Sequence, residues 1–292
     1  MSTVPTTPST PESDTREAVR RLVAAADYEL IPLKGLDDKL GALAPATTVT
    51  VTSSVKLGLE RTLQQSLRAA AAGYHVVPHL PARQVRDEAE LRSFVGRIRD
   101  AGITGLYVIG GDAPEPLGPY QSAAQLLAAL AGIDHGLQEI GVACYPEGHP
   151  SITDEALLAA LLEKQPHATY MVSQLCFDGD AVLGWLRGIR RAGVTLPLHL
   201  GLAGPLSMLK LAELSVRIGV GASVKYLTKQ HGLVGSLLRG SSYKPEDLLL
   251  GMGEDLTAPE LGIASLHLCT FNQVEATHDW QRRIAGGGLD QR

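Results

Sequence analysis

The chain has 292 residues, of which 45% are hydrophobic and 20% are charged, and its net charge is -5. This length can bury one large core and allows one or two domains, and the mildly acidic, interspersed charges argue against nucleic acids and membrane surfaces as partners. No apolar run reaches the roughly 18 residues of a membrane span, and the N-terminus lacks a basic-then-apolar signal pattern, so we expect a soluble, cytoplasmic protein.

The N-terminal segment differs in composition from the rest of the chain. Residues 1–14 are rich in Ser, Thr and Pro and hold almost no large apolar side chain. Such a segment cannot bury enough surface to order itself, so we expect a disordered tail. We assign residues 15–284 to one catalytic domain and expect residues 285–292 to form a flexible C-terminal tail.

Short β-prone runs alternate with longer amphipathic stretches along this domain. The expected strands are 28–32, 47–52, 74–78, 106–109, 140–144, 169–174, 196–202 and 265–271, and the expected helices include 59–72, 88–101, 122–133, 154–164, 180–192 and 208–218. A β-then-α unit repeated eight times predicts a closed (β/α)₈ TIM barrel of the α/β class. The alternative is an open doubly wound sheet, which is less favoured because no Gly-x-Gly-x-x-Gly follows the first strand.

The three cysteines, Cys144, Cys176 and Cys269, are far apart, and each lies in an apolar, strand-like run. This placement favours buried thiols. The sequence contains neither a disulfide framework nor a metal-ligand spacing, so we expect no metal site.

Polar residues at the carboxyl ends of the strands are the candidates for chemistry, because a TIM barrel carries its active site there. The densest group is Tyr-Pro-Glu-Gly-His-Pro at 145–150, which follows the fifth strand. Glu29, His79, Asp112 and Gln174 lie in or after the first, third, fourth and sixth strands. Each of the first three has a structural alternative: a salt bridge for the glutamate, a satisfied core position for the histidine, and a turn or helix cap for the aspartate.

These features form an ordered set that spans about residues 28 to 275. Besides the segment at 145–150, the set contains Tyr28-Glu29-Leu30-Ile31-Pro32, Arg61-Thr62, Pro78-His79-Leu80, Gly111-Asp112, Tyr120, Ser173-Gln174, Phe177-Asp178 and Thr270-Phe271-Asn272. Taken together, they resemble the methylenetetrahydrofolate reductase family. Its members are (β/α)₈ barrels that reduce 5,10-methylenetetrahydrofolate to 5-methyltetrahydrofolate, which feeds methionine synthesis, and they classically use NADH or NADPH and a bound FAD.

The resemblance implies a role for individual residues. It makes Glu29 the catalytic acid and gives Asp112 a catalytic and pterin-binding role. It implies substrate contacts at Gln174, Asp112, Phe177, Asn272 and Gln273, and cofactor contacts at His79, Gly111, Tyr120, Tyr145, Glu147, His149 and Lys164. Opening of the folate ring requires a proton on N10, and we expect burial to raise the pKa of Glu29 toward the neutral range in which a general acid works well.

The sequence departs from the family mainly at the flavin contacts. Gly110 stands where the family has an Arg that meets the FAD phosphates, and the helix at 154–164 is rich in Ala and Leu, with Lys164 as its only retained contact. Each lost charge-assisted hydrogen bond contributes about 1.5–3 kcal/mol. We therefore expect weak or absent flavin and a direct transfer of hydride from the nicotinamide to the methylene carbon.

Two departures fall on the folate side. The family's stacking aromatic is replaced near residues 208–209, and Gln273 stands where an Arg meets the folate glutamate tail, a role for which Lys225 and Lys229 are candidates. The alternatives that remain open are another folate or one-carbon barrel enzyme, such as a methyltransferase or a lyase, and a non-catalytic folate-binding relic. The expected partners are reduced folate and a pyridine nucleotide, and the sequence leaves a homo-oligomer open.

Overall fold

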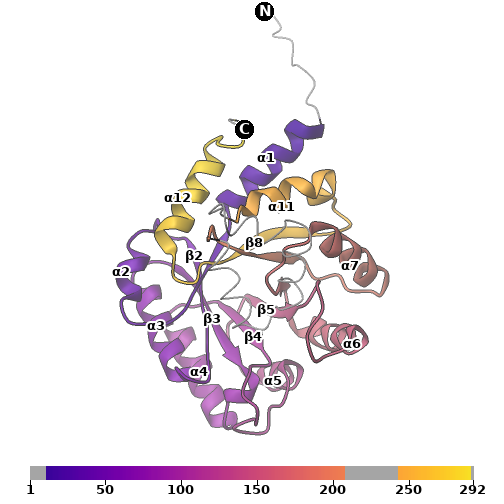
Figure 1. Cartoon of the computed structure of the whole chain (residues 1–292). Coiled ribbons are helices and arrows are strands. Elements are labelled where there is room, and N and C mark those ends of the chain that lie inside the picture. The colour runs from indigo at the N-terminus through magenta and orange to yellow at the C-terminus, as the bar shows by residue number, and fades with distance from the viewer. Residues whose placement is uncertain (1–10, 208–242, 291–292) are drawn as a thin grey trace, which may run out of the picture.

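A computed structural model describes residues 11–207 and 243–290 of the chain, and these residues form a closed barrel of parallel strands surrounded by helices (Figure 1). The strands are β1 Asp27–Leu30, β2 Thr48–Val51, β3 His75–Pro81, β4 Gly105–Ile109, β5 Glu139–Cys144, β6 Tyr170–Ser173, β7 Leu198–Ala203 and β8 Ile263–Cys269. They pair in chain order, and β8 closes on β1. The predicted TIM barrel is confirmed, and the open sheet is excluded.

The helices lie outside the barrel. They are α1 Pro11–Ala24, α2 Leu36–Leu40, α3 Leu59–Ala71, α4 Glu88–Asp100, α5 Ala123–Leu130, α6 Asp154–Lys164, α7 Gly179–Arg191, α11 Pro245–Gly251 and α12 Val274–Ala285. The side chains of Asp87, Ser122, Thr153 and Asp178 each accept a hydrogen bond from a backbone N–H three residues later, which explains why α4 to α7 begin where they do. The helix expected at 208–218 lies outside the described residues.

Helix α1 begins at Pro11, four residues before the expected start of the domain. It packs beside α12 and α11 (Figure 1). Near the C-terminus, Leu289 is fully buried, its carbonyl accepts a hydrogen bond from Arg16, and Asp290 forms an ion pair with Arg20. The two ends of the described chain therefore stabilise each other, and residues up to 290 belong to the folded domain.

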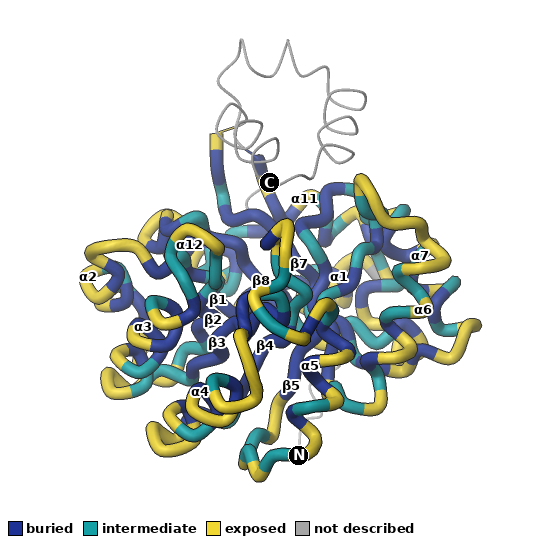
Figure 2. The backbone as a smooth tube through the Cα atoms, turned by 90° about the horizontal axis from the view of Figure 1, so that it is seen from below, coloured by how far each residue is buried: buried dark blue, intermediate teal, exposed yellow. Residues whose placement is uncertain are grey.

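The main core lies between the strands and the helices. Outward-facing strand residues such as Leu30, Leu80, Leu106 and Leu200 are completely buried, whereas the outer helix faces are exposed (Figure 2). This alternation follows from the period of two along a strand, which sends neighbouring side chains to opposite faces. All three cysteines are buried and carry free thiols, as the sequence predicted.

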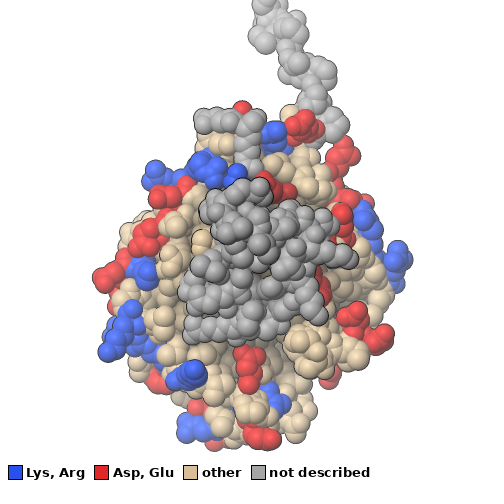
Figure 3. Space-filling view, in the orientation of Figure 1, with Lys and Arg blue, Asp and Glu red and all other residues tan. Residues whose placement is uncertain are grey.

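The surface agrees with the interspersed charges of the sequence. On the face shown in Figure 3, acidic and basic side chains both occur around the periphery. Among the described residues, no helix has the length and apolar character of a transmembrane segment.

The interior of the barrel holds a second, smaller cluster, formed by Val77, Tyr107, Tyr170 and Val172. The Tyr170 ring lies directly over Gly141 of β5, where a Cβ atom would be 2.6 Å from the ring. The barrel is therefore a filled core rather than a channel at this level, and the glycine makes room for the phenol.

We expect Gly141→Ala to lower the free energy of unfolding by about 1–3 kcal/mol, because its methyl group has to displace an aromatic ring in a filled interior. Gly184→Ala, in the exposed face of α7, is the matched control. No described atom lies within 4 Å of its added methyl group, so helix propensity should make it neutral or stabilising by up to about 1 kcal/mol. Urea unfolding measures both, and a Gly141→Ala protein as stable as the wild type would contradict the filled interior.

Candidate active site

Three polar side chains from different strands meet inside the barrel. Glu29 Oε2 of β1 is 3.2 Å from His267 Nε2 of β8 and 3.9 Å from His79 Nε2 of β3. The two imidazoles are almost completely buried, whereas the glutamate side chain keeps 22% of its surface exposed. Solvent can therefore reach part of the carboxylate. We call the end of the barrel where the strands terminate the barrel mouth.

The alternation along β1 and β8 places these groups inside. Tyr28 points outward, since its hydroxyl donates to the Gln281 side chain of α12 at 2.7 Å, and Glu29 consequently points inward. In β8, His267 alternates with the fully buried Leu266 and Leu268. The sequence left the direction of the glutamate open, and the structure shows that it faces the barrel interior.

The pKa of Glu29 is lowered to about 2, contrary to the expectation that burial moves it toward neutrality. Burial does raise the pKa, but the hydrogen bond from His267 and the positive charges that His267 and His79 carry when protonated lower it more. That expectation was wrong because the sequence shows the burial and not the neighbouring imidazoles. Glu29 is therefore ionised near pH 7.

The surroundings of His79 favour its neutral form. Burial lowers its pKa to about 4, and the charge of Glu29 offsets this only in part. Its ring meets the Tyr107 ring edge-on, with 4.6 Å between the centroids. Burial also raises the pKa of Tyr107 well above its usual value, so this phenol stays protonated beside the two imidazoles.

A second group of predicted residues lies in the loops at the barrel mouth. Asp112 is exposed in the loop after β4, and after burial it is the next cause of the raised pKa of Tyr145. The Tyr145 and His149 rings meet edge-on at 5.2 Å, and His149 Nδ1 accepts a hydrogen bond from the Ser151 N–H at 3.2 Å. The half-buried Gln174 accepts one from the N–H of the next residue, Leu175. These side chains keep polar atoms near the mouth that a ligand can use.

Two residues predicted to contact ligands connect the loops after β5 and β6 instead. Glu147 Oε1 accepts hydrogen bonds from the N–H groups of Phe177 and Asp178, at 2.5 Å and 2.9 Å. The Phe177 side chain is buried, and its ring packs against Tyr243 with 5.5 Å between centroids. In this structure both residues stabilise the loops.

Lys164 and Asn272 are engaged in similar contacts. Lys164 is buried, and its Nζ donates to the Ala143 carbonyl oxygen of β5 at 2.7 Å. The Asn272 side chain accepts from the N–H of Ile31 and donates to its carbonyl oxygen, at 2.8 Å and 2.9 Å. The lysine thus ties α6 to the barrel wall, and the asparagine ties the loop after β8 to the end of β1.

The three remaining predicted positions, Gly111, Tyr120 and Gln273, differ in how far they are buried. Gly111 has a φ of 88°, and an added Cβ would be 2.7 Å from Pro81, so the turn itself requires a glycine there. Tyr120 is mostly buried, whereas Gln273 is exposed at the start of α12. Of these, the glutamine alone presents an exposed side chain to a ligand.

Two basic side chains of this region are hydrogen-bonded to the protein itself. At Gly110, no described atom lies within 4 Å of an added Cβ, so the missing Arg is not a steric requirement of the fold. Lys164 is turned into the wall, and the nearby Arg83 donates to the carbonyl oxygens of Ala113, Pro114 and Gln121. These two basic side chains are therefore already hydrogen-bonded to backbone carbonyl oxygens of the barrel and its loops.

Sequence reasoning missed His267 and Tyr107, although both lie in the central cluster. A signal was present for the histidine: in Ser-Leu-His-Leu-Cys, at 265–269, polar and apolar residues alternate, which is typical of a strand with one polar face. The pattern does not say whether this polar face points into the barrel. Glu29, the partner of His267, is 238 positions away in the sequence.

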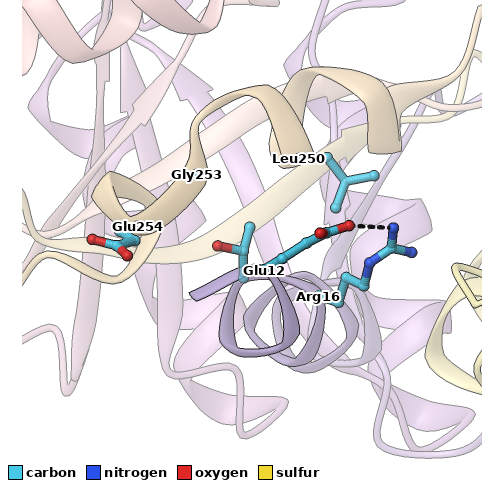
Figure 4. Close-up of a pocket in the computed structure, with 6 residues that line it drawn as sticks. Glu12, Arg16, Leu250, Gly253 and Glu254 are labelled. Atoms are coloured by element: carbon cyan, nitrogen blue, oxygen red, sulfur yellow. Dashed lines mark hydrogen bonds and ion pairs between the residues drawn. The ribbon is translucent and has the colours of Figure 1, made fainter. Parts of the chain in front are cut away.

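A surface cavity of about 330 Å³ lies away from this cluster, between α1 and the segment that follows α11 (Figure 4). Glu12 and Arg16 form an ion pair at its edge, at 2.8 Å, and Glu254 lies on the opposite side. None of the predicted site residues lines it.

The low pKa of His79 predicts a pH-dependent stability. Below about pH 6.5 the unfolded chain takes up a proton on this histidine, whereas the folded protein does not until about pH 4, so acidification favours unfolding across that interval. We expect the wild type to lose at most about 3 kcal/mol more than His79→Phe between these pH values. Urea unfolding at several pH values measures the difference, with His167→Phe, outside the barrel, as the control. An unchanged slope in the His79→Phe protein would show that this histidine is not held neutral by burial.

Comparisons with known proteins found one similar solved structure and one matching family. A solved structure titled as a putative lyase/mutase from Burkholderia cenocepacia J2315 is similar with a TM-score of 0.48 and 15% identity, over 97% of this chain and 87% of that chain. The sequence profile of the family described as methylenetetrahydrofolate reductase matches residues 38–218. Because that match spans more than half of the chain, this protein belongs to the methylenetetrahydrofolate reductase family.

Proposed function

We propose that this protein reduces 5,10-methylenetetrahydrofolate to 5-methyltetrahydrofolate with NADH or NADPH, by direct transfer of hydride from the nicotinamide to the folate. Membership of the family supports an oxidoreductase that acts on a reduced folate. The observation that carries the specific reaction is the Glu29–His267 pair, a carboxylate 3.2 Å from an imidazole inside the barrel. A cytoplasmic location and a supply of methyl groups for methionine synthesis belong to the proposal and rest on the sequence resemblance and composition.

The pair supplies the proton that opens the folate ring. The methylene carbon bridges N5 and N10, and it accepts hydride only after the bond to N10 breaks and an iminium forms at N5. In the proposed step, the imidazolium form of His267 gives its Nε2 proton to Glu29, which passes it to N10 and leaves His267 as a neutral imidazole. Binding of the folate excludes water from the carboxylate, which favours its neutral form relative to the free protein.

The proposed reaction balances in atoms and electrons without a flavin. The nicotinamide gives hydride to the methylene carbon, which becomes the methyl group on N5, and leaves oxidised. The proton on N10 comes from the Glu29–His267 pair, which solvent then reprotonates. The committed contacts of Lys164 and Arg83 support this route, because they leave the FAD diphosphate without these two cations.

The first test removes the acid. We expect Glu29→Gln to lower turnover at least about 100-fold, because the amide has nearly the same shape but cannot relay a proton. Asp27→Asn is the matched control: it removes the same charge from the same strand, but its carboxylate pairs with His199 at 3.1 Å. The control should keep most of the turnover. A folded Glu29→Gln protein with near-normal turnover would exclude the glutamate as the acid.

The second test follows the hydrogen itself. Direct transfer requires both substrates in the mouth together, with the reacting carbons about 3–3.5 Å apart. We expect intersecting double-reciprocal lines and deuterium from the reduced nicotinamide retained in the new methyl group. A flavin relay predicts parallel lines and loss of label to solvent, and the purified protein would then release about one FAD per chain on denaturation. Those results would overturn direct transfer, and no oxidation of NADH or NADPH with this folate would overturn the reductase proposal itself.

A further inference from the structure

The cluster of Glu29, His79 and His267 has a property that proton transfer does not use. One ligating atom of each residue, a carboxylate oxygen and two imidazole nitrogens, lies within 4.8 Å of the other two. They come from β1, β3 and β8, whose backbones are held by the closed sheet. Two histidines and one carboxylate on a rigid scaffold form a donor set that binds divalent transition metals in proteins.

Like His267 Nδ1, the cluster nitrogen His79 Nε2 is unsatisfied. This nitrogen is buried and has no hydrogen-bond partner among the residues that the structure describes. It lies 3.9 Å from Glu29 Oε2, which is too far for a hydrogen bond. A buried polar atom without a partner is costly, and a metal ion between the two groups satisfies it without moving the strands.

Two of the three distances between the donor atoms are close to those around a small ion. With metal–ligand bonds of about 2.0–2.1 Å, donors in a tetrahedral zinc site lie roughly 3.4 Å apart. The distances from Glu29 Oε2 to the two imidazole nitrogens, 3.2 Å and 3.9 Å, lie on either side of that value. The partial exposure of the glutamate side chain leaves room for a water molecule or a substrate atom as a further ligand.

The donor types narrow the choice of ion. Mg²⁺ and Ca²⁺ prefer sites built from oxygen alone, whereas imidazole nitrogen suits Zn²⁺, Co²⁺ and their neighbours. Tyr107 packs edge-on against His79, and this contact limits the rotation of the imidazole ring. Such support around a ligand is typical of metal sites in proteins.

We propose that Glu29, His79 and His267 bind one divalent transition-metal ion of the Zn²⁺ type, and that the bound ion inhibits the enzyme. The carboxylate oxygen that ligates the ion is the one that accepts the proton from His267, so metal and proton compete for the same atoms. Metal binding rests on the geometry of the cluster alone, whereas inhibition rests on the proposed reductase function.

Binding is measured directly with Co²⁺, whose visible absorption reports coordination by protein ligands. We expect the metal-free full-length chain to bind one Co²⁺ with visible bands that Zn²⁺ abolishes and a large excess of Mg²⁺ does not. His79→Ala should weaken binding at least tenfold, since even residues that only support ligands contribute about 10–100-fold. His199→Ala is the matched control, because that histidine also pairs with a carboxylate inside the barrel but has no third ligand group beside it among the described residues.

Two results would overturn the site: no Co²⁺ bands in the wild type, or unchanged affinity in a His79→Ala protein with native circular dichroism. If that variant does not fold, His79→Gln replaces it, since the amide keeps a polar side chain. The absorption test needs no turnover, so it stands even if the reductase proposal fails. With an active enzyme, we expect Zn²⁺ to lower turnover at least tenfold and a chelator to restore it; full activity with the site occupied would overturn inhibition alone.

Discussion

The hydrogen bond between Glu29 and His267 is the interaction on which the site depends. A carboxylate inside a barrel is costly to bury unless a partner compensates its charge. Here the imidazole at 3.2 Å compensates it, and this bond joins β1 to β8, the two strands that close the barrel. The same contact therefore compensates the buried charge of Glu29, links β1 to β8 inside the barrel, and provides a path for a proton.

Because the barrel interior is largely polar, the fold depends on its outer layer for hydrophobic stabilisation. Deeper along β1, Asp27 pairs with His199 at 3.1 Å, and the Tyr170 ring stacks on that imidazole at 4.3 Å. Much of the space inside the barrel is thus filled by paired polar groups and aromatic rings rather than by aliphatic layers. The hydrophobic free energy has to come from the outer layer, where strand leucines and valines meet the amphipathic helices.

The loops around the mouth are stabilised by side chains that bond to backbone groups. Asn272 has a φ of 61° and Phe271 a φ of 49°, both in the left-handed region that is strained for these residues. The two hydrogen bonds of Asn272 to Ile31 support that conformation, as Glu147 supports the loop after β6.

Such contacts also explain the limits of prediction from sequence. Periodicity identified every strand that the structure describes, because burial patterns are local. A polar residue at a strand end, however, looks the same in the sequence whether it binds a ligand or a neighbouring loop.

The same limit applies to electrostatics, and it separates the roles of the two histidines. The burial of Glu29 followed from its strand, but the direction of its pKa shift depends on His267 and His79, which no local pattern connects to it. His267 is within hydrogen-bond distance and can share a proton with the carboxylate, whereas His79 is not and acts on it through charge alone. In the tautomer protonated on Nδ1, neutral His79 keeps a lone pair on Nε2, which can take either a proton at low pH or a metal ion. In the proposed reaction and metal site, a proton, a metal ion and a substrate compete for one carboxylate oxygen, and the fold contributes by keeping the three strands at fixed distances.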